Sequence, residues 1–250
     1  MEMSMPPVLL TSCITVSDHS VALKDEKYRI DHTLESIEKW LNICSKMKLV
    51  ICDGSNFNLS EIATAAFPGA NIECLNFRNS DNMVRAYGKG YGEGEIVNHA
   101  IANSEYLSES EYFAKCTAKL WVENYAECLA KWNGIFLCQG VFDQVFSFRK
   151  THFSHIDTRF YLASKTFYQK NFSSAYLRLA KGQGLSIEDH FLEIVREENL
   201  EGVLFSTPPV VCGVGGGNGV YYKNNIRRRL KDKLRLHIVK SNRSFRPLFR

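Results

Sequence analysis

Two stretches decide the fold of this chain: PVLLTSCITV at residues 7–16 and KLVICDGSN at residues 48–56. Residues 8–16 of the first and 48–52 of the second are runs of apolar and β-branched side chains that suit buried strands. Between them, residues 31–47 carry apolar side chains at helical spacing, which predicts an amphipathic helix. A strand, a helix and a second strand in this order indicate a parallel pair in an α/β protein.

The second predicted strand ends at the polar turn DGSN, residues 53–56. A short helix over 59–67 and a third strand over 71–77 follow, which favours an α/β fold with a mainly parallel sheet and helices on both faces. Ligands bind at the carboxyl ends of such strands, so Asp53 lies at the expected site. Further elements are expected as a helix over 95–104, a strand over 112–123, a helix over 124–132, an apolar run over 134–148 and a helix over 186–198.

Composition narrows the class of protein. The 250 residues are 45% hydrophobic and 23% charged, which suits a full core and excludes a disordered or fibrous chain. No apolar stretch is long enough to span a bilayer, and MEMSMPPVLL at the start lacks the features of a secretory signal. The eight cysteines include no C-x-x-C pair, which indicates reduced, buried thiols in a cytosolic protein. No linker divides the chain, so we expect one domain over residues 1–222 and a tail over 223–250.

This tail is strongly basic, whereas the rest of the chain is acidic. It holds eleven Lys or Arg and one Asp, a balance of +10, and the whole chain carries +4, so the remainder carries −6. Ile226, Leu230, Leu234 and Ile238 recur every fourth residue and predict one apolar stripe on a helix. The basic residues around the stripe are Arg227, Arg228, Arg229, Lys231, Lys233 and Arg235.

Three interpretations of this basic amphipathic helix are open. We favour an anionic membrane surface, with the apolar stripe in the headgroup region. The second interpretation is a helix that packs on the body and exposes a solvated basic face. Nucleic acid is the least expected partner, because Phe245 and Phe249 follow the basic run instead of alternating with it.

Nine of the sixteen glycines lie in two clusters, at residues 88–94 and 213–219. Glycine lets backbone N–H groups approach an anion closely, and the first cluster includes Lys89 and precedes a predicted helix. This arrangement suits a diphosphate, although neither the P-loop pattern nor the dinucleotide-binding pattern is present. A mobile surface loop without a ligand explains the first cluster equally well.

Two groups of polar residues are candidates for chemistry. Glu188 and Asp189 lie in the first turn of a predicted helix, where helix capping is their commoner role and general-base catalysis the alternative. His152, His155 and Asp157 offer three metal-capable side chains within six residues, but their spacing matches no known zinc site. We therefore expect surface histidines there and no bound metal.

In chain order, these segments resemble GT-A-type glycosyltransferases, which have the nucleotide-diphospho-sugar transferase fold. The resemblance to family 2 of these enzymes rests on residues 7–16, Arg29 with TLESIEKWL (33–41), CDGSN (52–56), GKGYGEGEIVNHAIANS (88–104) and SIEDHFLEI (186–194). It implies a single GT-A-like, Rossmann-related domain with a mainly parallel central sheet, helices on both faces and a basic C-terminal amphipathic helix.

One segment departs from that family. Where its members carry a metal-binding Asp-x-Asp, this chain has YFAKCTAKLWVEN at residues 112–124. This segment resembles the K-x-T-G-R strand of bacterial capsule and O-antigen transferases, with Ala118 and Lys119 in place of Gly-Arg. The same group is similar in DTRF (157–160) and in the late glycine-rich GVGGGNGVYY (213–222).

The resemblance also implies roles for individual residues. Asp189 is the favoured catalytic base and Glu188 the second choice. The residues implied in donor binding are Arg29, Asp53, Ser55, Gly88, Lys89, Gly90, Lys115, Thr117, Lys119 and Arg159. Those implied around the acceptor and the late loop are Asp157, Gly216, Gly217 and Tyr221.

The missing Asp-x-Asp changes the expected electrostatics. A leaving nucleoside diphosphate needs its charge neutralised by Mg²⁺ or Mn²⁺ or by fixed cations. Lys89, Lys115, Lys119 and Arg159 are the candidates, and Lys115 and Lys119 would share one face of a continuous strand. We therefore assign no metal ligand and expect weak or absent dependence on a divalent metal.

The function implied is transfer of a sugar from a nucleotide-sugar to a lipid-linked glycan in bacterial surface polysaccharide assembly. The basic tail would hold such an enzyme on the inner face of the plasma membrane. One rival is a sugar nucleotidyltransferase, but TSCITVSDHS at residues 11–20 lacks the basic, glycine-rich loop expected there. The other rival is a non-enzymatic module that binds nucleic acid or a protein partner.

Overall fold

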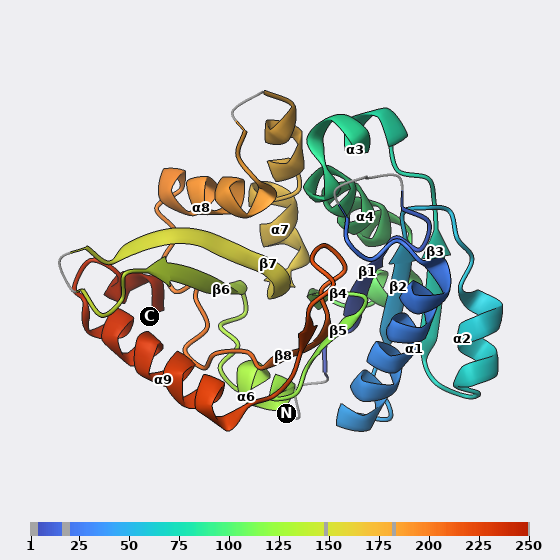
Figure 1. Cartoon of the computed structure of the whole chain (residues 1–250), viewed down its shortest axis with the longest axis horizontal. Helices are drawn as coiled ribbons and strands as arrows, with labels where there is room; N and C mark the ends of the chain where they lie inside the picture. The colour runs from blue at the N-terminus through green and yellow to red at the C-terminus, as the bar shows by residue number, and fades with distance from the viewer. Residues whose placement is uncertain (1–4, 17–20, 148–149, 182–183, 250) are drawn as a thin grey trace.

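A six-stranded sheet forms the centre of the computed structural model, which describes residues 5–16, 21–147, 150–181 and 184–249 (Figure 1). Its strands are β1 (Val8–Ser12), β2 (Leu49–Asp53), β3 (Ile72–Asn76), β4 (Tyr112–Thr117), β6 (Phe136–Asp143) and β7 (His152–Ser164). Their order is β3-β2-β1-β4-β7-β6. The first four are mutually parallel, and β7 runs antiparallel to both β4 and β6.

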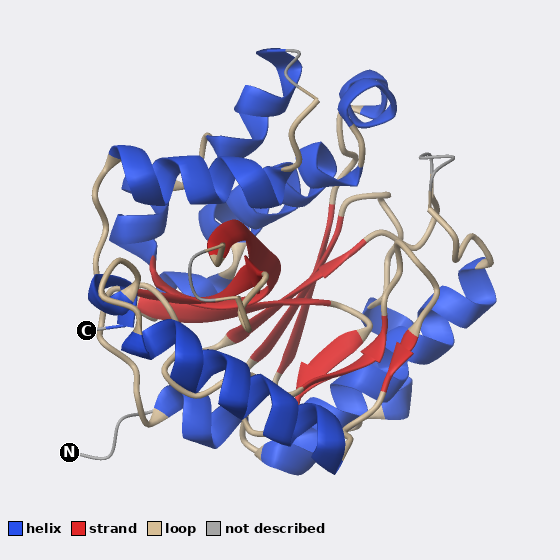
Figure 2. Ribbon diagram, turned by 60° about the vertical axis from the view of Figure 1, so that its left-hand side comes forward, coloured by secondary structure: helices blue, strands red, loops and turns tan. Residues whose placement is uncertain are grey.

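Helices cover both faces of this sheet (Figure 2). They are α1 (Glu26–Ile43), α2 (Ser60–Ala66), α3 (Asp81–Tyr87), α4 (Lys89–Asn103), α5 (Glu105–Ser108), α6 (Tyr125–Leu129), α7 (Lys165–Asn171), α8 (Ile187–Glu197) and α9 (Ile226–Ser241), with 3₁₀ turns η1 (Ala175–Lys181) and η2 (Arg246–Phe249). Leu9 packs with α4 and α8 on one face, and Leu10 packs with α1 on the other. The strands are therefore continuously apolar because both faces are buried. This confirms the predicted fold class.

A smaller antiparallel sheet lies beside the carboxyl end of β4. It consists of β5 (Leu120–Val122), β8 (Val211–Val214) and β9 (Tyr221–Tyr222), in the order β5-β8-β9. The glycine-rich residues 215–219 connect β8 to β9. Gly213 has a φ of +103°, and a Cβ there would lie 2.2 Å from the Lys119 carbonyl oxygen, so only glycine fits this position.

Three expected elements differ from the structure. The strand expected over 112–123 is two strands, because the chain turns at Ala118 and Lys119. The cluster 88–94 is not a loop, since α4 begins at Lys89. Residues 152–164, where surface histidines were expected, form the longest strand of the sheet. The end of the apolar run 134–148, at residue 148, lies outside the described residues.

The basic tail forms the predicted helix and packs in part against the body. Val239 on α9 is buried, and the Phe245 ring lies 5.0 Å from that of Phe142. Beyond α9, residues 247 and 248 accept backbone hydrogen bonds from residues 202 and 204. In Figure 1, α9 crosses below β6 and β7. No helix in the described part of the chain is long and apolar enough to cross a bilayer.

The first half of α9 presents its apolar side chains to solvent. Ile226, Leu230 and Leu234 are 74%, 63% and 52% exposed, and we call these three residues the α9 stripe. The fourth residue of the predicted stripe, Ile238, is partly buried against the core. Packing on the body therefore explains the second half of the helix and leaves its first half unpartnered among the described residues.

Candidate functional site

The carboxyl ends of β1 and β4 open into a cleft with a volume of about 330 Å³. This is the edge where parallel α/β sheets bind ligands. Residues from both sheets, from α1, α4 and α8 and from the late glycine-rich loop meet here. The polar and glycine residues used below are Ser12, Arg29, Asn79, Lys89, Gly92, Glu93, Thr117, Lys119, Thr158, Arg159, Glu188, Gly215, Gly216, Gly217 and Tyr222.

Asp53 holds two backbone segments together beside this cleft through hydrogen bonds. It is 1% exposed, and its Oδ2 accepts a hydrogen bond from the Ile14 backbone N–H at 2.9 Å. Its Oδ1 accepts from the backbone N–H groups of Ser55 and Phe57 and from the Ser55 hydroxyl. The carboxylate therefore ties the turn after β2 to the segment after β1. Neither Asp53 nor Ser55 lines the cleft, and their contact with a donor stays a prediction.

Three cationic side chains converge on the late glycine-rich loop. A Cβ on Gly216 would lie 2.8 Å from Lys119 Cε and 3.6 Å from an Arg29 nitrogen. A Cβ on Gly217 would lie 2.8 Å from Lys89 Nζ. The loop thus covers these cations closely because it has no side chains there. We call Arg29, Lys89 and Lys119 the cation cluster.

No member of this cluster forms an ion pair with a described carboxylate, although the charge of Asp53 opposes the fall in the pKa of Arg29 and of Lys119. Arg29 donates to the carbonyl oxygens of Cys13 and Leu23, both at 2.7 Å. Burial, with the nearby Arg29 charge adding to it, lowers the pKa of Lys119 to about 7. Burial also lowers the pKa of Arg29. An entering anion would stabilise these charges, so the site is prepared for one.

Two buried polar atoms of the cleft also lack hydrogen-bond partners in the described structure: Ser12 Oγ and Asn79 Oδ1. Ser12 ends β1, and Asn79 follows β3, so they come from two strands of the parallel half that lie on either side of β2. A buried polar atom without a partner is destabilising unless something else satisfies it. Both atoms therefore fit a polar ligand better than an empty cleft.

Lys115 lies in a different place from Lys119. It is fully buried, forms an ion pair with Glu93 of α4, and donates to the Thr158 carbonyl oxygen at 2.8 Å. It does not line the cleft. The expectation that Lys115 and Lys119 share one strand face was wrong, because β4 ends at Thr117 and the turn redirects Lys119. Thr117 itself lines the cleft.

Arg159 and Asp157 form a partly buried ion pair on β7. The Arg159 Nε donates to both Asp157 oxygens, at 2.8 and 3.0 Å. Burial opposes both charges, but this pairing outweighs it, so the pKa of Asp157 is lowered and that of Arg159 is raised. The Arg159 guanidinium lies 4.9 Å from the centre of the Tyr222 ring. Arg159 lines the cleft and Asp157 does not.

Tyr222 reaches the cleft, whereas Tyr221 points away from it. The Tyr221 hydroxyl donates to Glu35 on α1, so the predicted position of Tyr221 beside the late loop does not bring it into the cleft. Successive residues of β9 face opposite sides, as strands require. The sequence analysis did not identify Tyr222. The alternation of side chains along a strand indicates that only one of the two tyrosines faces the cleft, but it does not indicate which one.

Of the two candidate bases, only Glu188 lines the cleft. Its Oε1 lies 3.5 Å from the Thr158 hydroxyl. Asp189 instead completes a capping box: its Oδ2 accepts from the Ser186 N–H at 2.9 Å and from the Ser186 hydroxyl at 2.7 Å. Burial raises the pKa of Asp189, but the bonds from Ser186 outweigh it and lower the pKa overall. The capping role that spacing favoured is therefore what Asp189 performs here.

The early glycine cluster serves mostly helix packing. Gly88, at a φ of +80°, lets α3 end and α4 begin at Lys89. A Cβ on Gly90 would lie 3.0 Å from the Ile187 side chain, and one on Gly94 would lie 2.4 Å from Tyr176. These glycines let α4 approach its neighbours closely, which is a different role from cradling a phosphate.

No group of three or more His, Cys, Asp or Glu in the described residues could hold a metal ion. In particular, His152 lies 3.4 Å from Asp143, His155 contacts Ser154, and Asp157 is paired with Arg159. The donor set of the cleft is dominated by cations and hydroxyls, which does not fit Mg²⁺ or Mn²⁺.

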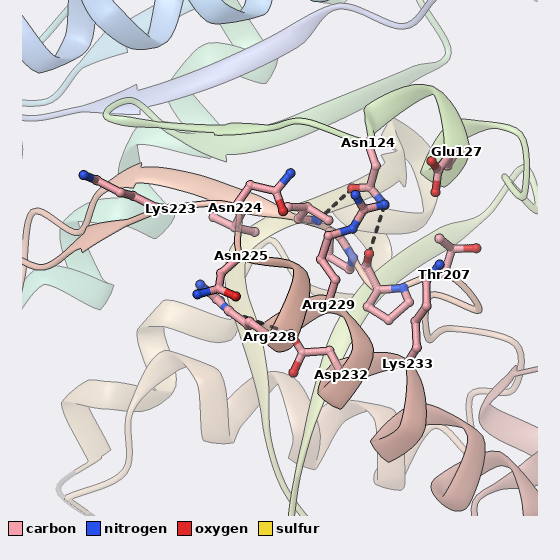
Figure 3. A pocket seen from close by; sticks show the side chains of 14 residues that line it. Asn124, Glu127, Thr207, Lys223, Asn224, Asn225, Arg228, Arg229, Asp232 and Lys233 are labelled. Carbon is pink, nitrogen blue, oxygen red and sulfur yellow. Dashed lines mark hydrogen bonds and ion pairs between the residues drawn. The ribbon is translucent and has the colours of Figure 1, made fainter.

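A much smaller hollow lies at the start of α9, with room for about 20 Å³ (Figure 3). Asn124 fixes its wall, since its amide accepts from the Val210 N–H at 2.7 Å and donates to the Pro208 carbonyl oxygen at 3.0 Å. Figure 3 shows Arg228 and Asp232 on its α9 side. This volume holds about one water molecule, so the hollow is not a substrate site.

No protein-family model matches this chain, and no curated protein matches it. The strand order and the small antiparallel sheet make the fold GT-A-like, as the sequence resemblance implied. Among solved structures, the chain is similar to a protein from Desulfovibrio desulfuricans G20 described as a nucleotide-diphospho-sugar transferase. The two are 11% identical with a TM-score of 0.49, and the match covers 81% of this chain and 80% of that one.

Two further solved structures are similar at the same level. The inositol-1-phosphate CTP transferase from T. maritima is 12% identical with a TM-score of 0.47, and the match covers 96% of this chain and 98% of that one. Mouse xyloside xylosyltransferase 1 is 11% identical with a TM-score of 0.45, and the match covers 80% and 83%. Functional inference for this chain therefore depends on the side chains of its own cleft.

Proposed function

We propose that this chain is a glycosyltransferase that moves a sugar from a nucleotide-sugar to a glycan acceptor. The observation that carries the proposal is the cation cluster, which has no described carboxylate partner and faces the same cleft as the carboxylate Glu188. A nucleotide-sugar has a diphosphate that needs cations. Its acceptor has a hydroxyl that needs a base. The cleft offers both kinds of group.

The cation cluster would act on the leaving group. As the bond between the anomeric carbon and the diphosphate oxygen breaks, negative charge grows on that oxygen. Fixed cations in a partly dehydrated cleft stabilise such charge without reorganising, and this is the same task that a divalent metal performs in other enzymes. The Arg29 and Lys119 side chains are buried and therefore fixed in position. Lys89 is exposed, so its side chain can adjust to the bound ligand.

Glu188 would act on the nucleophile. The acceptor hydroxyl attacks the anomeric carbon while its proton passes to the Glu188 carboxylate, and the nucleoside diphosphate leaves. One displacement of this kind inverts the anomeric configuration. Asp189, which the sequence favoured for this role, has both its position and its Oδ2 committed to the cap of α8. Asp53 and Ser55 would support donor binding from the turn beneath the rim.

A sugar nucleotidyltransferase is the alternative use of such a cleft. Its nucleophile is a sugar-phosphate oxygen, which is already ionised at neutral pH and needs no base. The presence of Glu188 in the cleft therefore favours a hydroxyl nucleophile. The products distinguish the two reactions, because glycosyl transfer releases a nucleoside diphosphate and nucleotidyl transfer releases pyrophosphate.

The first test is thermal unfolding with UDP-, GDP-, CMP- and dTDP-sugars, each with Mn²⁺ or with EDTA. A ligand at about 100 times its Kd stabilises the folded state by about 2.7 kcal/mol, a clear rise in Tm. We expect one nucleotide class to raise the Tm equally with Mn²⁺ and with EDTA. A rise that requires Mn²⁺ contradicts the role of the cation cluster, and no rise with any donor contradicts the proposed function.

The acceptor in this proposal is lipid-linked, as in bacterial surface polysaccharide assembly, and the protein works on the cytoplasmic side of a membrane. The support is the α9 stripe, whose apolar side chains stay exposed beside basic residues. Apolar groups at the headgroup level and cations near anionic lipids both favour binding. Such docking would bring the cleft near an acceptor whose lipid anchor lies in the bilayer.

Replacing the three residues of the α9 stripe by serine tests this docking. We expect lost binding to vesicles of anionic phospholipid and unchanged turnover of a short soluble acceptor. The matched control replaces Ile135, Phe146 and Leu177, which are 49%, 60% and 45% exposed and lie outside α9. Equal vesicle binding by both triple variants would contradict the membrane role.

A further inference from the structure

A second open cavity, of about 190 Å³, lies between α9 and the strands β6 and β7. It is a neighbour of the cleft, and Arg159 lines both. The residues of this cavity used below are Gln139, Phe142, Asp157, Arg159, Phe205, Pro208, Arg228, Asp232, Arg235, Leu236 and Phe249. We call it the α9 cavity.

The floor of the α9 cavity is polar and incompletely satisfied. Gln139 and Asp157 are cross-strand partners on β6 and β7, next to a register shift between Cys138 and Gln139. The Gln139 Nε2 donates to the Gly140 carbonyl oxygen at 2.9 Å, whereas its buried Oε1 has no partner among the described residues. A bulge re-aims a side chain, and an unsatisfied buried oxygen is destabilising unless a ligand donates to it.

The walls of the cavity combine apolar and aromatic side chains with the charged residues Arg228, Asp232 and Arg235 of α9. Phe142 and Phe205 come from the sheet side, Leu236 from α9 and Phe249 from the last turn. A pocket with apolar walls and a few fixed polar groups suits a ligand with both kinds of surface. A pyranose ring is such a ligand, because its C–H faces pack on apolar groups and its hydroxyls donate to acceptors such as the Gln139 oxygen.

Three side chains lie where the α9 cavity and the cleft adjoin. The centre of the Tyr222 ring lies 4.9 Å from the guanidinium of Arg159 and 5.8 Å from that of Arg228. Arg159 faces both spaces, and its partner Asp157 faces only the α9 cavity. A molecule in the cavity and a molecule in the cleft would therefore contact the same guanidinium.

We infer that the α9 cavity binds a sugar ring of the acceptor glycan. This inference rests on the proposed function, because the cleft takes the donor and the adjoining cavity then takes the second substrate. The cavity orients the acceptor through the Gln139 oxygen and the apolar walls. The acceptor would then contact α9, the helix whose exposed stripe would contact the membrane.

The test measures binding of soluble sugars by saturation-transfer NMR. The probes are the methyl glycosides of glucose, galactose, mannose, N-acetylglucosamine and glucuronic acid. The first variant, Leu236→Trp, fills the cavity from α9, and we expect binding about tenfold weaker or worse. The second variant, Gln139→Leu, removes one hydrogen-bond acceptor, and we expect binding about three- to tenfold weaker.

Leu177→Trp is the matched control, since it makes the same change at an exposed leucine that lines neither the α9 cavity nor the cleft. It should bind sugar as the unchanged protein does. The rise in Tm with the nucleotide-sugar is measured for every variant and reports the cleft separately. Unchanged sugar binding in Leu236→Trp, or no binding of any probe to the unchanged protein, overturns the inference. A missing nucleotide response in the unchanged protein overturns the proposed function instead.

Discussion

Affinity for a nucleoside diphosphate should fall steeply as the pH rises above 7, because of Lys119. Burial holds the pKa of this ammonium at about 7 in the unliganded protein. About half of the molecules therefore carry the charge at pH 7, and about one in a hundred carries it at pH 9. If only the charged form binds the diphosphate, the Kd increases about 50-fold between these two pH values. The terminal phosphate of a nucleoside diphosphate has a second pKa of about 6, so its ionisation is mostly complete at pH 7 and adds little change above that pH.

The perturbation is Lys119→Met, which keeps the unbranched shape of the side chain as far as Cε and removes the charged ammonium. This variant should bind more weakly than the unchanged protein at pH 6.5 and equally at pH 9, because the unchanged lysine is neutral there. A charged hydrogen bond contributes about 1.5–3 kcal/mol, so the loss at pH 6.5 should be about 10- to 150-fold. Lys131→Met, an exposed lysine outside the cleft, is the control.

Isothermal titration calorimetry with the nucleoside diphosphate identified in the unfolding screen provides the assay. In two buffers of different ionisation enthalpy, binding at pH 7 should take up about half a proton, and the Met variant should take up none. Stability gives an independent check. The pKa of Lys119 is lower in the folded protein than the usual 10.5, so the unfolded chain binds more protons between pH 7 and 10.5. The contribution of Lys119 to the free energy of unfolding of the unliganded protein therefore increases as the pH rises from 7 to 10.5. A Kd that stays constant from pH 6.5 to 9 would refute the reasoning.

Three further predictions concern catalysis, packing and the rim of the cleft. Glu188→Gln should lower kcat by about 10²–10⁴-fold and leave the Kd for the nucleotide unchanged. Asp189→Asn should lower the Tm and leave kcat close to normal. Steady-state kinetics in which Asp189→Asn loses activity and Glu188→Gln keeps it would contradict the assignment. Gly94→Ala places a methyl group 2.4 Å from the Tyr176 side chain and should destabilise the fold by about 1–3 kcal/mol in urea unfolding. The two Asp53 oxygens accept four hydrogen bonds, and Asp53→Asn replaces one oxygen by an NH2 group that cannot accept. It should destabilise the fold by about 1–3 kcal/mol, and unchanged stability would argue against the place of Asp53 at the centre of the rim.

The parallel half of the fold could be predicted from sequence because its strands are buried on both faces. The segments 8–12 and 49–53 are therefore apolar throughout, and the turn at Asp53 marks where the second one ends. By contrast, β7 is only half buried, and its register shifts against β6 interrupt the alternation of side chains. Its His, Asp and Arg residues then resembled a surface segment with possible metal ligands, which concealed a strand.

The start of α4 was concealed for another reason. Glycine has low helix propensity, so GKGYGEG at residues 88–94 predicted a loop. In the structure Gly90, Gly92 and Gly94 are helical. Asn79 approaches Gly92 and Tyr176 approaches Gly94 so closely that a side chain would not fit there. Tertiary packing outweighs local propensity here, and no local pattern shows which neighbours will arrive.

The candidate site was predictable in its residue types and less so in its geometry. Lys119 and Arg29 do meet in the cleft, but Lys115 is neutralised by Glu93, a contact between segments 22 residues apart in the chain. Ser12 and Asn79 were not predicted, since a serine or asparagine at a strand end is common and only burial reveals the missing hydrogen bond. These contacts depend on how β4, α4 and the late loop pack against one another, and no short stretch of sequence predicts that packing.

The electrostatic boundary of this chain and its packing boundary do not coincide. Charge changes sign near residue 223, which invites dissection of the protein into a catalytic body and a removable tail. Yet the backbone carbonyl oxygens of residues 247 and 248 accept hydrogen bonds from residues 202 and 204, and Phe245 packs on Phe142. A chain cut at residue 222 would lose part of its core along with its basic helix, so the proposed membrane binding is better separated from the proposed catalysis by substitutions on the outer side of α9 than by truncation.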